Sequence, residues 1–231
     1  MTTLRFLGTR GNIEESSPRH RYHSSLLMLK PRIMIDYGTI HRRPIGDIHP
    51  KYLLITHAHL DHYAWTEEEV ETEAEVYLTR ETIEYAKRRP ATYRIVEPGD
   101  RFTLGRLNVE VYDVVHSLRC PAVGYRLTDG KGVTFAYNPD LVDIKEKDRI
   151  LNGVDVYIGD GSCIQANLVR RRGDSVYGHA RVTTQANWCR KRGIDRIIFT
   201  HLGKETIRRE ARFSERNPDL VFAHDGMEIQ I

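Results

Sequence analysis

The sequence predicts a layered α/β fold built on two sheets, and three observations lead to that class. Short apolar runs rich in β-branched and aromatic residues recur along the whole chain. Turns that carry Gly, Pro and Asp separate these runs. Segments with helical periodicity are fewer and join the strands in the second half, as in sheets covered by helices. The expected strands are Leu4–Leu7, Ser25–Leu29, Ile33–Ile35, Leu53–Thr56, Leu107–Val115, Val123–Leu127, Val133–Tyr137, Val154–Ile158, Ile194–Thr200 and Asp219–Ala223.

Three segments are expected to be helical: Thr79–Arg89, Val182–Arg192 and Lys204–Phe213. The second has an apolar face opposed by basic residues, which is the pattern of a helix that covers a sheet. The polar run from Thr128 to Gly132 lies between two expected strands and predicts a hairpin turn.

Length and composition indicate one globular domain over residues 1–231, because no linker divides the chain. Apolar residues make up 40% and charged residues 29%, which is ordinary for a soluble protein. No apolar run approaches the roughly 18 residues of a membrane span, and the N-terminal residues lack a signal-peptide pattern. We therefore expect a cytoplasmic protein without a membrane partner. The net charge of +3 does not select a class of partner.

Cysteine usage argues against a disulfide framework or a thiolate zinc site. Cys120, Cys163 and Cys189 are odd in number, far apart in the sequence and free of any C-x-x-C pair. We expect ordinary buried thiols at all three positions.

A dense group of histidines and one aspartate follows the expected strand that ends at Thr56. The residues are His57, His59, Asp61 and His62. Packing alone does not call for so many polar side chains together, since each is costly to bury without a partner. Imidazole and carboxylate are ligands for zinc, iron and manganese, and this spacing lets neighbouring residues reach two ions at once. The run predicts a pair of adjacent metal ions.

Three further residues share one context, the end of an apolar strand. His116 follows Val109–Val115, Asp140 follows Val133–Tyr137 by three residues, and His201 follows Ile197–Thr200. Strand ends can bring residues that are distant in sequence to one rim of a sheet, which a two-metal site requires.

The order of these residues along the chain resembles that in the metallo-β-lactamase-fold hydrolases, and the resemblance extends over the full length. The resemblance implies an αββα sandwich of two mixed sheets flanked by helices. It also implies two divalent metal ions, Zn or Mn, with Fe as a further candidate. By resemblance, the first ion takes His57, His59 and His116, the second takes Asp61, His62 and His201, and Asp140 bridges the two.

Within that superfamily the chain is most similar to the tRNase Z branch and to the cyclic-phosphate phosphodiesterase of the carbon–phosphorus lyase pathway. The shared motifs are His116-Ser117, Gly124-Tyr125, Gly178-His179-Ala180 before a helix, Thr200-His201 after a strand, and Asp225-Gly226-Met227-Glu228. The resemblance implies that His179 lies beside the metals without binding them and donates a proton to the leaving group. It also implies a homodimer.

Two departures set the chain apart from both of these enzymes. tRNase Z carries a long arm between its third metal histidine and its bridging aspartate, whereas His116 and Asp140 are only 24 positions apart. The cyclic-phosphate enzyme has an additional cysteine-rich zinc site near its N-terminus, whereas no cysteine precedes Cys120 here. The chain is therefore not expected to be a simple copy of either enzyme, and these departures bear on its substrate more than on its chemistry.

The chemistry expected of this site is hydrolysis by a metal-bound hydroxide. Two divalent ions lower the pKa of a bridging water toward neutrality and neutralise charge on phosphoryl oxygens. Asp61 would bind one ion and orient the attacking hydroxide, and His179 would protonate the departing oxygen. Asp160 either orients His179 or is an ordinary turn residue. Arg170, Arg171 and Arg172 either capture a substrate phosphate or form a solvated charge run.

The leading hypothesis is a dinuclear phosphodiesterase that acts on a nucleotide, a cyclic phosphate or an RNA end. Its substrate would be a phosphorylated small molecule or a nucleic acid. One alternative is a thioester or lactone hydrolase of the glyoxalase II type. Another is a metal-binding protein without turnover. A serine hydrolase is disfavoured because the chain has no G-x-S-x-G elbow.

Overall fold

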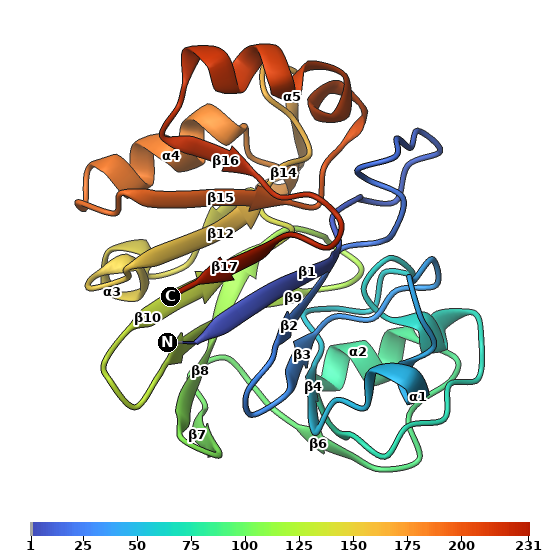
Figure 1. Cartoon of the computed structure of the whole chain (residues 1–231). Helices are drawn as coiled ribbons and strands as arrows, with labels where there is room; N and C mark the ends of the chain where they lie inside the picture. The colour runs from blue at the N-terminus through green and yellow to red at the C-terminus, as the bar shows by residue number, and fades with distance from the viewer. Residues whose placement is uncertain (1) are drawn as a thin grey trace.

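The structure, a computed structural model, describes residues 2–231, so Met1 of the expected domain lies outside it. Two large sheets pack face to face (Figure 1). The first has the strand order β17-β1-β2-β3-β4-β5-β6 and is antiparallel from β17 to β3 and parallel from β3 to β6. Its strands are β1 (Thr3–Gly8), β2 (Ser25–Met28), β3 (Ile33–Ile35), β4 (Tyr52–Leu54), β5 (Glu75–Leu78), β6 (Tyr93–Ile95) and β17 (Glu228–Gln230).

The second sheet repeats that half-antiparallel, half-parallel plan. Its order is β11-β8-β9-β10-β12-β15-β16, with β7 paired to β8, and it is parallel from β10 to β16. Because β8 and β10 both run antiparallel to β9, the strands β8, β10, β12 and β15 all end at the same rim. Its strands are β7 (Arg101–Leu104), β8 (Leu107–Val115), β9 (Ala122–Thr128), β10 (Thr134–Tyr137), β11 (Asp143–Ile144), β12 (Val156–Asp160), β15 (Arg196–Thr200) and β16 (Leu220–Phe222).

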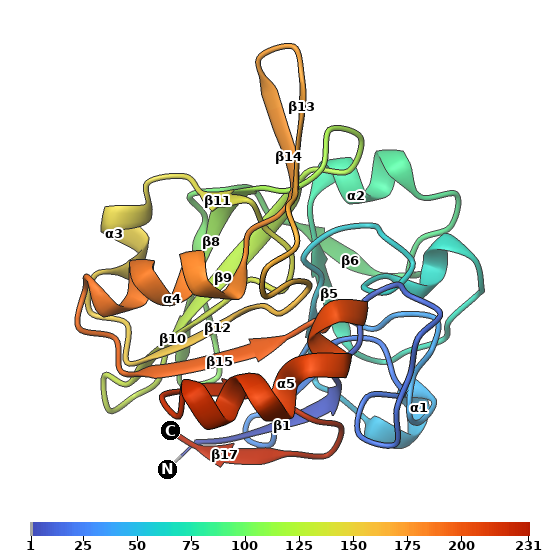
Figure 2. The same cartoon turned by 90° about the horizontal axis from the view of Figure 1, so that it is seen from above.

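Helices lie on the outer side of each sheet, which confirms the αββα class expected from the sequence (Figures 1 and 2). The short helices α1 (Ile45–Ile48), η1 (Ala64–Thr66) and α2 (Arg80–Tyr85) accompany the first sheet. The helices α3 (Lys147–Leu151), α4 (Val182–Arg190) and α5 (Lys204–Arg216) accompany the second. None of the helices in residues 2–231 combines the length and apolarity that a bilayer crossing requires.

Three apolar layers follow from this arrangement. The central layer, which includes Phe6, Val111 and Tyr125, lies between the two sheets, and each of these side chains is almost fully buried. The second layer joins the outer face of the second sheet to α3 and α4. The third joins the first sheet to α1 and η1 and contains the buried Trp65. The three cysteines are free thiols buried in the protein, as the sequence predicts.

A two-stranded hairpin stands apart from both sheets and projects from the body of the molecule (Figure 2). It consists of β13 (Leu168–Arg172) and β14 (Ser175–His179). The sequence did not predict these strands, because the arginines in β13 break the apolar alternation that marks a half-buried strand.

The predicted element boundaries differ from the structure mainly at helix ends. The segments Ile33–Ile35 and Leu107–Val115 match β3 and β8 residue for residue. By contrast, the helix expected over Thr79–Arg89 ends at Tyr85. Three adjacent positive charges and Pro90 follow that residue, and a residue before proline avoids the helical conformation.

Candidate metal centre

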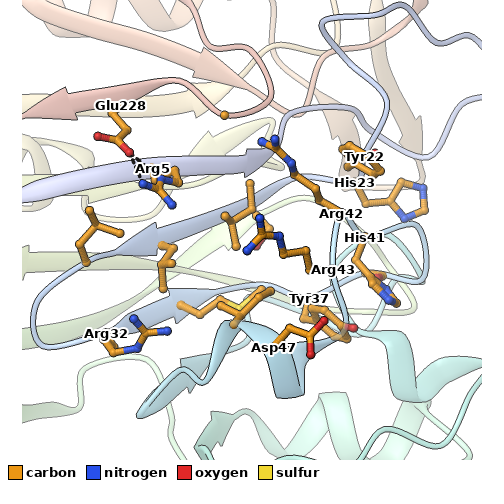
Figure 3. Close-up of a pocket in the computed structure, with 18 residues that line it drawn as sticks. Arg5, Tyr22, His23, Arg32, Tyr37, His41, Arg42, Arg43, Asp47 and Glu228 are labelled. Carbon is orange, nitrogen blue, oxygen red and sulfur yellow. Dashed lines mark hydrogen bonds and ion pairs between the residues drawn. The ribbon is translucent and has the colours of Figure 1, made fainter.

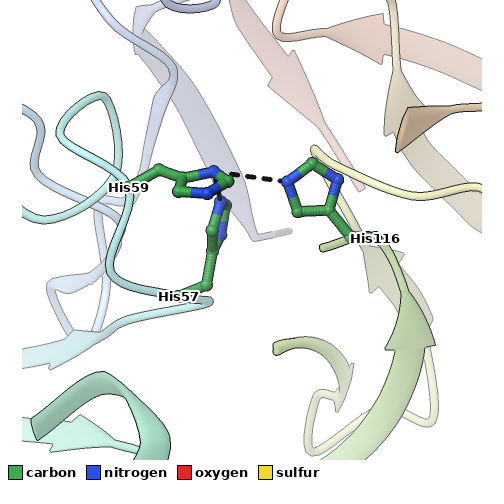
Figure 4. Close-up of side chains that lie close together, drawn as sticks. All are labelled: His57, His59 and His116. Carbon is green, nitrogen blue, oxygen red and sulfur yellow. Dashed lines mark hydrogen bonds between the residues drawn. The ribbon is translucent and has the colours of Figure 1, made fainter. Parts of the chain in front are cut away.

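Three histidine rings meet between the two sheets (Figure 4). His57 and His59 come from the turn after β4, and His116 directly follows β8. His57 Nε2 lies 2.9 Å from His59 Nδ1, which lies 3.3 Å from His116 Nε2. Nitrogen ligands around a tetrahedral zinc ion lie about 3.3 Å apart, so this spacing is that of a metal-ligand set.

A second group lies beside the first and consists of Asp61, His62, Asp140 and His201. His201 Nε2 lies 2.8 Å from Asp61 Oδ2, and His62 Nε2 lies 3.4 Å from that same oxygen. All four residues are buried. Two imidazoles and two carboxylates in one buried cluster form a second set of the same chemistry.

Asp140 lies between the two groups. Its Oδ2 is 2.6 Å from His62 Nε2 and 3.8 Å from His57 Nε2, and its Oδ1 is 3.9 Å from His116 Nε2. One carboxylate therefore faces both sets, as the sequence-based prediction of a bridging role requires.

The donor atoms fit a metal ion better than they fit one another. His62 Nε2 and Asp140 Oδ2 are buried and have no hydrogen-bond partner among the described residues, although they are close neighbours. Their mutual orientation is not that of a hydrogen bond. Orphaned buried polar atoms of this kind are rare in folded proteins and indicate a bound ion or water. The residues present therefore fit a divalent metal.

Other residues hold the histidine rings in place. Asp36, at the end of β3, accepts a hydrogen bond from His62 Nδ1 at 2.9 Å and two more from the backbone and hydroxyl of Thr56. His116 Nδ1 donates to the carbonyl oxygen of Gly178 at 3.1 Å. Such contacts select the tautomer whose other nitrogen is free to bind a metal.

The pKa shifts divide the histidines into two kinds. Burial lowers the pKa of His57 well below its usual value and that of His116 to about 4, so both rings are neutral at pH 7. A metal ligand must be neutral, so these two rings are ready to bind. Burial also lowers the pKa of His201, but the neighbouring carboxylates of Asp140 and Asp61 outweigh burial and raise that pKa to about 9.

His179 lies at the end of β14, next to both groups. Its Nδ1 lies 2.8 Å from Asp160 Oδ2 and 3.1 Å from Asp140 Oδ1. Burial lowers the pKa of His179, but the neighbouring Asp160 and then Asp140 outweigh that effect and raise it well above its usual value. Its Nε2 has no partner among the described residues, and its side chain is 23% exposed and lines the cavity over the cluster.

That cavity has a volume of about 780 Å³. Besides the ligand-type residues it is lined by Tyr85, by Leu168 at the base of the hairpin and by basic residues of α5. Lys204 and Arg208 both pair with Glu15, and Arg209 pairs with Glu205. Because α5 begins three residues after His201, its N-terminal turn faces the same cavity.

The structure therefore brings together every residue predicted from the sequence to bind metal, and it places Asp160 beside His179. It does not bring Arg170, Arg171 and Arg172 to the cavity. All three are exposed on the projecting hairpin and are absent from the described residues that line the cavity (Figure 2).

Two contributors were missed in the sequence. Asp36 is 20 residues from Thr56 in the chain, and a lone aspartate after a short apolar run does not differ from a turn residue. The position of the basic residues of α5 near the site was predictable, because that helix was expected to begin three residues after a strand-end histidine. The positive end of its dipole would then lie near the cluster.

Comparisons with known proteins agree with this geometry. Residues 39–202 match the family model described as a beta-lactamase superfamily domain. The chain is similar to a ribonuclease Z of Methanopyrus kandleri, with 27% identity over 281 aligned positions that cover 99% of this chain and 97% of that protein.

Two solved structures share the fold over almost their whole length. Human tRNase Z, short form, aligns with a TM-score of 0.67 at 15% identity, over 99% of both chains. A diphosphatase from the PhnP family aligns with a TM-score of 0.70 at 15% identity, over 100% of this chain and 98% of that one.

The hairpin depends on glycine at position 178. Gly178 has a φ of +109°, and a Cβ there would lie 2.0 Å from the carbonyl oxygen of Leu168. Gly178→Ala should therefore lower the free energy of unfolding by about 3 kcal/mol, because both strain and a backbone clash result. Gly173→Ala at the hairpin tip is the matched control, since its φ of +59° is also positive but nothing lies within 4 Å.

Urea denaturation measures both variants. Gly173→Ala should cost only about 1 kcal/mol, the usual penalty of a left-handed residue. Equal losses in the two variants would mean that Gly178 is not held against Leu168 as described.

Proposed function

Because this chain belongs to the beta-lactamase superfamily, we propose that it is a phosphodiesterase that uses two divalent metal ions held by the residues described above. It is a metal-dependent hydrolase, and the recognition of that class from the sequence is confirmed. The single observation that carries the proposal is the position of Asp140, whose carboxylate faces two separate sets of ligand-type side chains. Zn and Mn suit such donors, and Fe is a further candidate.

Bound metal ions supply Lewis acidity, which makes water more acidic and neutralises negative charge on a phosphoryl group. His57, His59 and His116 would hold one ion, and Asp61, His62 and His201 would hold the other. Asp61 also lines the cavity, so we assign it the further task of orienting the attacking water.

His179 is the proposed proton donor. Its Nδ1 hydrogen bond to Asp160 fixes the ring, and Nε2 is left without a partner on a ring that lines the cavity. The same carboxylate favours the protonated ring, so Nε2 carries a proton to give. A donor of this kind assists a poor leaving group such as an alkoxide, whereas a thiolate departs without help. This favours a phosphodiester over the thioester of the alternative reading.

The cavity also suits an anionic substrate. The N-terminal turn of α5 has no side-chain cap, and Lys204 lies in its first turn. Free backbone N–H groups with a basic neighbour attract phosphate. A nucleotide, a cyclic phosphate or an RNA end fits this description, and the similarity to a ribonuclease Z supports the same class. Contact with Arg170, Arg171 and Arg172 stays a prediction, which now concerns only substrates that extend beyond the cavity. The homodimer and the cytoplasmic location also stay predictions.

A pair of substrates tests the proposed reaction. With Mn²⁺ or Zn²⁺, the purified protein should hydrolyse bis-p-nitrophenyl phosphate and leave S-lactoylglutathione intact, because the cavity offers free backbone N–H groups and proposed metal ions to a phosphoryl group. The opposite preference would support the glyoxalase II type. A metal-loaded protein that turns over neither compound would support a binding protein without catalysis.

The second prediction concerns metal content. Elemental analysis of the purified protein should find two divalent ions per chain. Asp140→Ala should lower that content sharply, because it removes the carboxylate that faces both sets. Asp174→Ala, which removes an exposed aspartate from the hairpin tip, is the control and should keep both ions. Two ions retained in folded Asp140→Ala protein would exclude a bridging role.

The third prediction separates a proton donor from a ligand or a structural residue at position 179. His179→Ala should keep both ions and lower turnover of a substrate with a poor leaving group by roughly 10²–10⁴-fold. Turnover of a p-nitrophenyl ester should fall much less, because that leaving group hardly needs a proton. His224→Ala, at a partly buried histidine outside the cavity, should change neither rate. Equal losses on both substrates, or loss of an ion, would contradict the assignment.

A further inference from the structure

A second cavity lies on the outer face of the first sheet, where β1, β2 and β3 are left open beside α1 (Figure 3). Its volume is about 460 Å³. The floor consists of the outward-facing side chains of adjacent strands, namely Leu7, Leu27, Leu29 and Met34. We call this cavity the outer groove. Pockets of this size hold small organic ligands.

The rim of the outer groove is basic. Arg5, Arg32, Arg42 and Arg43 line it, against only two acidic residues, Asp47 and Glu228. Arg5 pairs with Glu228 at 2.6 Å, and Arg32 donates to the carbonyl oxygen of His49.

Arg42 and Arg43 have no hydrogen-bond or ion-pair partner among residues 2–231. Figure 3 shows both side chains extending from the segment before α1 over the strands. Two neighbouring guanidinium groups are therefore available to a ligand.

Two buried polar side chains in the lining also lack partners. His23 is 2% exposed, and its Nδ1 accepts a hydrogen bond from the backbone N–H of Ile40. The ring proton must then be on Nε2, which is a buried donor without an acceptor in the protein. The hydroxyl of Ser25, a residue that is 6% exposed, is buried and unpartnered in the same way. Buried donors without acceptors are rare and indicate a missing partner.

We propose that the outer groove binds a small organic phosphate. Among the described residues, its lining contains four unpartnered hydrogen-bond donors against one unpartnered, exposed carboxylate, that of Asp47. Two of the donors are guanidinium groups, and phosphate oxygens accept from guanidinium in pairs. The apolar floor gives the rest of the ligand a surface to cover, so a phosphate with an attached apolar or aromatic body fits better than the free anion. Arg42 and Arg43 are the residues that recognise its phosphate group, and His23 and Ser25 lie in the wall behind them.

The outer groove is separate from the candidate metal centre. No described residue lines both cavities. The segment after β3 lies between them, and the backbone N–H groups of Tyr37 and Thr39 donate to the carbonyl oxygens of His62 and Leu60, both at 2.9 Å. Binding in the groove is therefore a property distinct from the proposed hydrolysis, and neither proposal depends on the other.

Calorimetry of the metal-loaded full chain tests the proposal, with adenosine 5′-monophosphate, adenosine and inorganic phosphate as probes. The variant is Arg42→Ala/Arg43→Ala. The control is Arg106→Ala/Lys131→Ala, which removes the same charge from two exposed turns that line neither cavity. The dissociation constant of the nucleotide should rise by about tenfold or more in the variant and stay within about twofold in the control, because charge-assisted hydrogen bonds are lost only in the former.

Leu29→Trp, which narrows the groove and leaves both arginines in place, should weaken nucleotide binding as well. Adenosine should not bind at the groove, and inorganic phosphate should bind roughly tenfold more weakly than the nucleotide. Equal nucleotide binding by the wild type and Arg42→Ala/Arg43→Ala would overturn the proposal. Adenosine binding as tightly as the nucleotide would exclude recognition of the anion, and phosphate binding as tightly would exclude a contribution from the apolar floor.

Discussion

The buried carboxylate of Asp140 is the charge around which the centre of this molecule is arranged. Five imidazole rings, from His57, His62, His116, His179 and His201, have a nitrogen within 3.9 Å of one of its oxygens. A carboxylate buried this deeply is stable only where positive charge or hydrogen-bond donors surround it. Its pKa is well below the usual value because the histidines outweigh the effect of burial, so it stays ionised. Strand ends from both sheets must meet at one rim to supply those partners.

The sandwich architecture meets this constraint. In the second sheet β8, β10, β12 and β15 run in the same direction, so His116, Asp140, Asp160 and His201 reach one edge. The turn after β4 brings the remaining ligand-type residues from the first sheet. The projecting hairpin is tied to the same edge, because the backbone N–H of Gly178 donates to the carbonyl oxygen of His116 at 2.7 Å while the His116 ring donates back. A displacement of the hairpin would thus move one of the rings.

The two cavities differ in how their basic residues are paired. Over the candidate metal centre, Lys204, Arg208 and Arg209 are already paired with glutamates, so the proposed metal ions would supply most of the attraction for an anion. In the outer groove Arg42 and Arg43 are unpaired, and no cluster of ligand-type residues lies beneath them. Exposed ion pairs contribute little to stability, so unpaired surface arginines are common. What distinguishes the groove is the pair of buried, unpartnered donors at His23 and Ser25.

The fold class and the candidate metal ligands were predictable from the order of the residues along the chain. His57, His59, Asp61 and His62 are close in space because they are close in the chain, and His116, Asp140 and His201 are identifiable because each follows a readable apolar strand. The tertiary structure alone decided which residues support them. Asp36 reaches His62 across 26 residues. His23, just before β2, and Ser25, in β2, line the same cavity as Arg42 and Arg43 only because a loop folds over the sheet. It also decided that the arginines at 170–172 project outward. Short-range periodicity reports which side chains are buried, but contacts between distant segments depend on strand register and loop path, which no local pattern encodes.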